Sequence, residues 1–192
     1  MERSSPVLCG ANPCVFLYDN QDHICAALSL WEVDYSEFGS GLCAFLSTGV
    51  GAERRELVFY ERLELAIALR SHFNRHFEGF NGIGDEHCTA HHSSFLLHRQ
   101  GAGDLSIEAR AETFTLAGSW EKPHDPTIIP SRLTGFGPRA ETSFDVCATI
   151  IPCTTGEITL DGNKLDGQLN PNHGGFGSSA FLACAETWTR RP

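Results

Sequence analysis

The sequence predicts a mainly β protein: a single β-barrel of the lipocalin-like or calycin-like type, with about eight strands and one long amphipathic helix. Three observations predict this fold. Apolar and polar residues alternate along several stretches, as they do in half-buried strands. Gly, Pro, Asn and Asp separate these stretches at short intervals. One internal segment instead carries apolar residues at helical spacing.

The expected strands are spread over the whole chain, so residues 1–192 are expected to form one domain. A length of 192 residues is sufficient to bury one continuous apolar core. The stretch from 104 to 121 is long enough to bend or to divide. In chain order, the expected strands are Cys14–Asp19, His23–Val33, Leu42–Thr48, Ser93–Arg99, Asp104–Glu121, Thr142–Ile151, Glu157–Leu160 and Ser178–Arg190.

The amphipathic helix is expected at about residues 53–78. Gly79 and Gly82 follow it and would end it. Its apolar face is expected to lie on the sheet or to close one end of the barrel. The apolar stripe consists of Phe59, Leu63, Ile67, Phe73 and Phe77.

A Pro- and Gly-rich segment at about residues 122–138 is predicted to be a long loop without secondary structure. Loops of this length usually have a functional role, such as a lid or one wall of a site.

Charge and composition limit the partners of the protein. The formal net charge is −10 with 14 Lys and Arg residues, which argues against nucleic acid as a partner. No window approaches the ~20 apolar residues of a membrane span, and no secretory signal precedes the domain, so neither membrane insertion nor export is expected. Most of the eight cysteines lie in apolar runs, typical of buried thiols in a reducing compartment. We therefore expect a cytoplasmic protein.

The last expected strand holds the main catalytic candidate, Glu186. Counting by twos places Leu182, Glu186 and Trp188 on one face, while the other face is also apolar. A carboxyl in such surroundings has a raised pKa, which suits it to general acid or base catalysis. An ion pair with an Arg, or contact with water at the strand end, is the structural alternative.

A second carboxyl, Glu32, follows Leu28 and Leu30 on one face of an earlier strand, with Trp31 on the other face. Two inward carboxylates would make a catalytic site. Glu32 is therefore a further catalytic candidate, and Trp31 is expected to shape the cavity.

Histidines are frequent in the middle of the chain. His72 and His76 are four residues apart on the expected helix, a spacing that suits a transition metal. The sequence lacks an HExxH or Cys-x2-Cys pattern, and a helix-terminal His pair also interacts favourably with the helix dipole. We expect no metal, with His72 and His76 as the candidates if one is bound.

A glycine-rich loop, NPNHGGFG at residues 170–177, leads into the last expected strand. No helix follows it, so it does not match a phosphate-binding loop. A tight turn at the barrel mouth would bring His173 and Phe176 close to a cavity, so His173 is a catalytic candidate and Phe176 a ligand-binding candidate.

A resemblance to a known class of proteins involves the same region. GEITLDG at 156–162, Gly167, NHGGFG at 172–177 and the aromatic-rich last strand resemble the closing region of lipocalin-like hydratases and cyclases of the carotenoid hydratase and Diels–Alderase type. The similar region covers about a sixth of the chain. Those proteins have Asp before the His and Trp where this chain has Phe176, and they usually contain two barrels. The resemblance implies hydration or cyclisation of an apolar molecule.

These features favour a cofactor-independent enzyme of isomerase, cyclase or hydratase type, acting on a small, largely apolar organic molecule. Glu186 would be the acid or base and His173 would assist. The expected ligand-binding residues are Trp31, Trp188, Leu182 and Phe176. One alternative is a non-catalytic carrier of a similar ligand, and another is a metal-dependent protein centred on His72 and His76. The sequence leaves a homodimer open.

Overall fold

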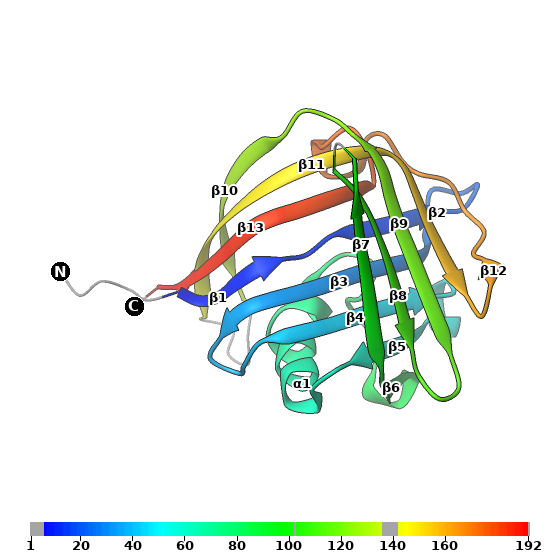
Figure 1. The fold of residues 1–192 in the computed structure, drawn as a ribbon, viewed down its shortest axis with the longest axis horizontal. Helices are drawn as coiled ribbons and strands as arrows, with labels where there is room; N and C mark the ends of the chain where they lie inside the picture. The colour runs from blue at the N-terminus through cyan, green and yellow to red at the C-terminus, as the bar shows by residue number, and fades with distance from the viewer. Residues whose placement is uncertain (1–5, 102, 136–141, 192) are drawn as a thin grey trace.

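The computed structural model describes residues 6–101, 103–135 and 142–191. Within these ranges the chain is mainly β, as predicted (Figure 1). The strands are β1 (Pro6–Ala11), β2 (Cys14–Tyr18), β3 (Ile24–Ser36), β4 (Gly41–Thr48), β5 (Arg55–Tyr60), β6 (Cys88–His92), β7 (Ser94–Gln100), β8 (Asp104–Arg110), β9 (Thr115–Pro123), β10 (Thr127–Thr134), β11 (Ser143–Leu160), β12 (Asn163–Lys164) and β13 (Ala180–Arg190). The helices are α1 (Leu63–His72) and the 3-10 turns η1 (Gly51–Glu53), η2 (Asn74–His76), η3 (Asp85–His87) and η4 (His173–Gly175).

The predicted barrel of about eight strands is wrong, because the strands form one mixed 13-stranded sheet. The main path of hydrogen-bonded neighbours is β6-β5-β4-β3-β1-β13-β11-β9-β8-β7, and β2, β10 and β12 pair beside it. Among the described strands, no pairing joins the two ends of this path, β6 and β7. The pair β5 and β6 is parallel, with α1 in the connection between them.

The long strand β11 joins the two limbs of the sheet. Its first part, up to Pro152, pairs with β13, and its second part, from Cys153, pairs with β9. Alternation suggested two separate strands here, whereas one 18-residue strand continues through both. The expected strand at 104–121 is instead divided, into β8 and β9.

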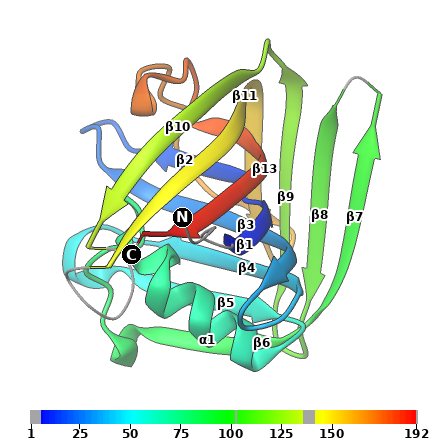
Figure 2. The same ribbon diagram turned by 90° about the vertical axis from the view of Figure 1, so that its left-hand side faces the viewer.

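The central strands bury side chains on both faces, and each face belongs to a different core. The core on the α1 side includes Trp31, Phe73 and Trp188. The second core lies between the central strands and the β8–β9 limb, and it includes Leu28 and Leu182. Figure 2 shows α1 and the β7–β9 limb on different sides of the central strands.

A missing side chain allows the limb to pack closely on the central strands. A Cβ on Gly118 of β9 would lie 2.4 Å from Leu28 Cδ2 of β3, well inside contact distance. The glycine is required here for close approach and not for its backbone freedom.

The helix is shorter than the predicted 53–78, since α1 has 10 residues. Residues 55–60 instead form β5, which pairs with β4 in an antiparallel hairpin and with β6. Cross-strand pairing on both sides outweighs the helical periodicity of this short apolar run. The predicted stripe is also displaced: Ile67 is 59% exposed, whereas Leu65 and Leu69 are buried.

The predicted loop at 122–138 contains strand β10, which pairs with β11 over residues 127–134. Pro130 is tolerated in β10 because, among the described strands, β10 pairs with β11 alone and is therefore an edge strand. Residues 136–138 of the predicted loop lie outside the described residues. The segment thus forms a wall of regular structure over part of its length.

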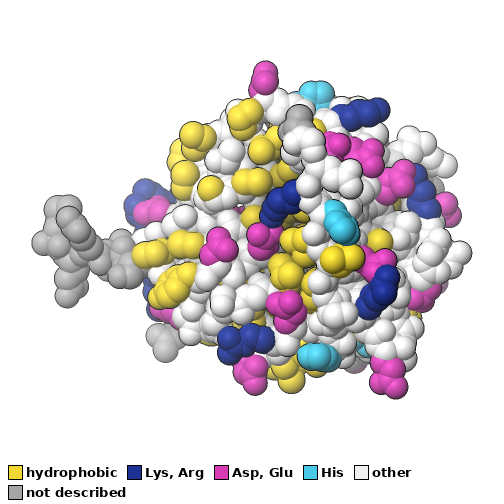
Figure 3. Space-filling view, in the orientation of Figure 1, with side chains coloured by type: hydrophobic (Ala, Val, Ile, Leu, Met, Phe, Trp, Pro, Cys, Tyr) yellow, Lys and Arg dark blue, Asp and Glu magenta, His cyan; other side chains and the backbone are white. Residues whose placement is uncertain are grey.

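The surface does not gather positive charge on the face shown in Figure 3, where basic side chains lie among acidic ones and hydrophobic atoms appear over β10, β11 and β13. Ile128 on β10 is 69% exposed. Among the described residues, no helix combines the length and the apolar character needed to cross a bilayer.

Candidate functional site

A cavity of about 310 Å³ lies on the α1 side of β10, β11 and β13. This volume is at the lower end of the range for small-molecule sites. Residues 77–78 and η4 complete its wall. Its lining comprises Asn12, Cys14, Phe16, Phe77, Glu78, Ile129, Ser131, Leu133, Val146, Ala148, Ile150, His173, Gly174, Phe176, Phe181, Ala183, Glu186 and Trp188.

A β-bulge in β13 directs Glu186 into this cavity. Cys184 pairs with Thr149 and Thr187 pairs with Cys147, so Ala185 and Glu186 together oppose one residue of β11. Ala185 has a φ of 50°, the left-handed conformation that such bulges use. The extra residue reverses the alternation of side chains along β13.

The bulge corrects the register expected from the sequence. Before it, Phe181 and Ala183 line the cavity, and after it Glu186 and Trp188 do so. Leu182 packs in the second core, on the opposite face. Leu182 and Glu186 therefore do not share a face, although period-two counting placed them together.

The Glu186 side chain is buried, at 5% exposure. Burial raises its pKa to about 7, and the hydrogen bond from the Trp188 indole N–H to Oε1 opposes that shift. Among the described residues, no Lys or Arg forms an ion pair with it. At neutral pH such a carboxyl exists in both protonation states, and either can act on a bound molecule.

A small polar cluster lies beside Glu186 at the start of β2. Asn12 Oδ1 accepts a hydrogen bond of 2.8 Å from Ser29 Oγ, and the Cys14 thiol donates to the Asn12 carbonyl over 3.4 Å. Burial and then the charge of Glu186 raise the pKa of Cys14 far above its ordinary value. Cys14 is therefore a neutral wall of the cavity and not a nucleophile.

His173 of η4 lines the cavity, beside Phe16 of β2 and Phe181 of β13. Its ring stacks on Phe16 with centroids 4.5 Å apart, and Tyr18 Oη lies 2.6 Å from its Nδ1. Burial lowers the pKa of His173, while burial and then Glu78 raise the pKa of Tyr18 to about 12. We assign the hydroxyl as the donor, because a phenol with a raised pKa keeps its proton. The imidazole proton is then on Nε2.

Four of the residues singled out in the sequence line the cavity together: Glu186, His173, Phe176 and Trp188. Trp31 is fully buried behind them, with its ring centroid 6.5 Å from that of Trp188. It supports the wall without lining the cavity.

Glu32 does not lie with Glu186. Its carboxylate is one third exposed and forms an ion pair with Arg99 of β7, on the side of the second core. The two carboxylates thus face opposite sides of the sheet and do not form a pair.

His72 and His76 do not gather further ligands. His72 Nδ1 lies 2.9 Å from the Ala68 carbonyl, and its ring lies 5.0 Å from that of Phe38. Burial lowers the pKa of His76. Among the described residues, no group of three His, Cys, Asp or Glu side chains is arranged to hold a metal ion.

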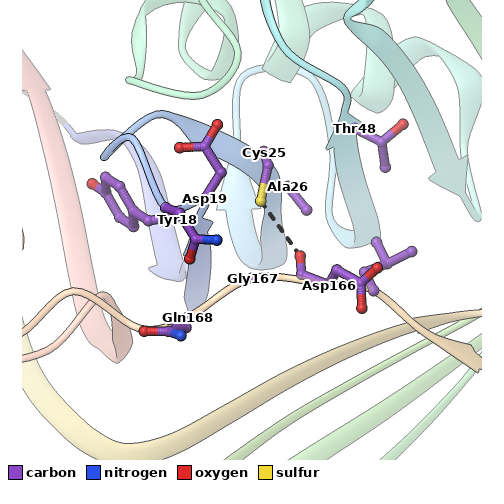
Figure 4. Close-up of a pocket in the computed structure, with 10 residues that line it drawn as sticks. Tyr18, Asp19, Cys25, Ala26, Thr48, Asp166, Gly167 and Gln168 are labelled. Carbon is purple, nitrogen blue, oxygen red and sulfur yellow. Dashed lines mark hydrogen bonds between the residues drawn. The ribbon is translucent and has the colours of Figure 1, made fainter.

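A second hollow, of about 460 Å³, lies between the ends of β2 and β3 and the loop at 165–168 (Figure 4). The Cys25 thiol faces it and donates to the Asp166 carbonyl over 3.4 Å. Burial raises the pKa of Cys25, which keeps the thiol protonated. The hollow therefore lacks an activated nucleophile at this cysteine.

Several lining residues were not expected from the sequence, above all Glu78, Phe16 and Phe181. Glu78 follows α1 in an irregular segment, where a helical count placed it on the exposed face. Phe16 and Phe181 lie within buried strands. The early end of α1 places Glu78 outside the helix, and the bulge in β13 brings Phe181 and Glu186 to the same cavity; neither feature has a clear signal in one sequence.

No family model, no curated protein and no solved structure matches the chain.

Proposed function

We propose that the cavity binds a small, largely apolar organic molecule and that Glu186 transfers a proton to or from it. The reaction class is isomerisation, cyclisation or hydration without a redox cofactor. The single observation that carries the proposal is the carboxyl of Glu186, buried in an apolar cavity with a pKa of about 7. The resemblance of residues 156–177 to lipocalin-like hydratases and cyclases agrees with this class.

The chemistry follows from the two protonation states of this carboxyl. The protonated form can donate to an alkene carbon or an ether oxygen, and the carboxylate can remove a proton from a neighbouring carbon. After protonation of an alkene, the cation that forms loses a proton to the carboxylate in an isomerisation, or bonds to water, which then gives its proton to the carboxylate, in a hydration. Glu186 is restored in both cases, and neither needs an oxidant or a reductant. Desolvation strengthens the carboxylate as a base, and the neutral His173 supplies a second proton-transfer group in the cavity wall.

The proposed setting is a reducing compartment such as the cytoplasm. All eight cysteines are free thiols, and Cys43 and Cys153 have pKa values raised to about 12 by burial. Such thiols serve as small apolar core residues.

A general proton-transfer probe tests the proposal before the natural substrate is known. In 5-nitrobenzisoxazole, a base removes the ring C–H proton, the N–O bond breaks and a coloured cyanophenolate forms. We expect turnover by the protein and a loss of about two to four orders of magnitude in Glu186→Gln. Ala148→Leu, which adds volume inside the cavity, should weaken binding of the probe.

Glu32→Gln is the matched control, because it makes the same chemical change outside the cavity. If Glu186→Gln turns over the probe as fast as Glu32→Gln does, the proposed role of Glu186 is refuted. If the protein binds the probe but does not turn it over, it is a non-catalytic carrier.

A further inference from the structure

We propose that the ligand of this cavity is an organic ammonium ion, with its apolar body among the aromatic rings and its charged nitrogen facing Glu186. The inference rests on the proposed function, since it names the substrate class of the same cavity.

The charges that line the cavity have one sign. Glu186 and Glu78 contribute carboxyl groups, and no Lys or Arg is among the described lining residues. His173 is the remaining ionisable base, and burial keeps it neutral. Among the described lining residues, no positive charge would attract an anionic ligand, whereas a bound cation would supply the positively charged partner that the buried Glu186 carboxylate lacks there.

Aromatic rings surround the same space on several sides. Phe16 and Phe181 are 6.2 Å apart between centroids, Phe176 and Phe181 are 5.4 Å apart, and the Trp188 ring packs against Phe77 at 6.3 Å. Ring faces attract organic cations, and the attraction is strongest where water is excluded. Aromatic rings together with one carboxylate are a recurrent arrangement for recognising an alkylammonium group.

The donor set favours an organic cation over a metal ion. A transition metal needs three or four protein ligands, and the described residues offer no such group. The Glu186 carboxylate, with aromatic rings around the same cavity, suits a cation that brings its own apolar body, because that body fills the space between the rings.

A bound ammonium would also set the direction of the chemistry. It favours the ionised form of Glu186, so the carboxylate acts as a base towards the bound molecule. Glu186 takes a proton from one atom of the bound molecule and returns it to another atom of the same molecule, which restores the carboxylate and completes an isomerisation.

The test compares three probes that share one body: 2-phenylethylamine, 2-phenylethanol and 3-phenylpropanoate, a cation, a neutral molecule and an anion. Isothermal titration calorimetry at pH 8 measures each dissociation constant. We expect the amine to bind at least about tenfold more tightly than the alcohol and the anion to bind most weakly. In Glu186→Gln, the preference for the amine over the alcohol should fall several-fold, to the share that the aromatic rings and Glu78 supply, while Glu32→Gln should keep it in full.

A Glu78→Gln variant separates the two carboxyl groups. Glu78 is exposed, so its loss should weaken amine binding by less than the loss of Glu186. Equal or tighter binding of the alcohol by the unmodified protein, or a preference for the amine that Glu186→Gln leaves undiminished, would overturn the ammonium proposal. If the benzisoxazole probe still turns over through Glu186 in that case, the proposed function stands and only the substrate class is wrong.

Discussion

Replacing Glu186 by Gln should make the protein more stable at alkaline pH. The folded protein holds the Glu186 proton with a pKa of about 7, against 4.5 for an unperturbed Glu. Since the raised pKa means that the folded state binds the proton more tightly, the contribution of Glu186 to stability is fully present below pH about 4.5 and is lost as the pH rises through about 7. A tenfold change in a proton-binding constant corresponds to about 1.4 kcal/mol, so the loss is about 3 kcal/mol.

The assay is urea unfolding followed by Trp fluorescence, for the wild type and Glu186→Gln, at a series of pH values from about 4 to 8. Gln keeps the shape of the side chain and an oxygen that accepts from the Trp188 indole, but it cannot ionise. The other ionisable groups near the site, Cys14, Glu78 and His173, are present in both proteins. Their contributions largely cancel in the difference between the two free energies of unfolding.

We expect that difference to move by about 3 kcal/mol in favour of Glu186→Gln between pH 4 and pH 8. Glu32→Gln should show no such trend, because Glu32 is partly exposed and paired with Arg99. A Gln variant that is less stable by several kcal/mol across the whole range would refute the reasoning. Such a loss would mean that Glu186 is ionised and paired in the folded protein.

Further predictions concern the packing around the site. Arg70→Met should cost about 3 kcal/mol in urea unfolding, because Glu56, 1% exposed and 2.6 Å from Arg70 Nε, would lose its partner. Arg99→Met should cost less than about 1 kcal/mol, because its partner Glu32 is a third exposed. Equal losses of stability in the two variants would contradict this. Gly118→Ala should cost about 1–3 kcal/mol of stability by overpacking, because its Cβ would meet Leu28. In a Leu28→Ala background this cost should be smaller, and strictly additive losses of stability in the double variant would argue against the contact. The melting temperature should be the same with and without reductant, since all eight cysteines are free, and a large drop with reductant would reveal a disulfide.

The sequence was informative where local pattern decides structure. Alternation located β2, β3, β4 and β13 close to their observed positions, because these strands are rich in apolar residues and are bounded by turn residues. The same rule missed β5, whose short run of apolar residues also fits a helix and forms a strand because β4 and β6 pair with it. Such pairing depends on distant residues, so no local window contains it.

The candidate site was predicted in part for the same reason. Glu186 and His173 stand out in the sequence as polar residues next to apolar ones, and the fold brings both to one cavity. Glu32 has the same local pattern but faces the other core. The bulge at Ala185 decides which side chains accompany Glu186, and alternation alone gives no sign of a bulge.

The pH dependence of kcat/KM for 5-nitrobenzisoxazole tests most directly whether the buried Glu186 carboxylate acts as a base inside this cavity. The pH dependence of kcat/KM reports the pKa values of groups in the free protein. The value of kcat/KM should therefore rise with pH, inflect at about 7 and reach a plateau above it. The rise should disappear in Glu186→Gln and persist in Glu32→Gln. An inflection near 4.5, the ordinary value for Glu, or a profile that Glu186→Gln leaves unchanged, would contradict the assignment.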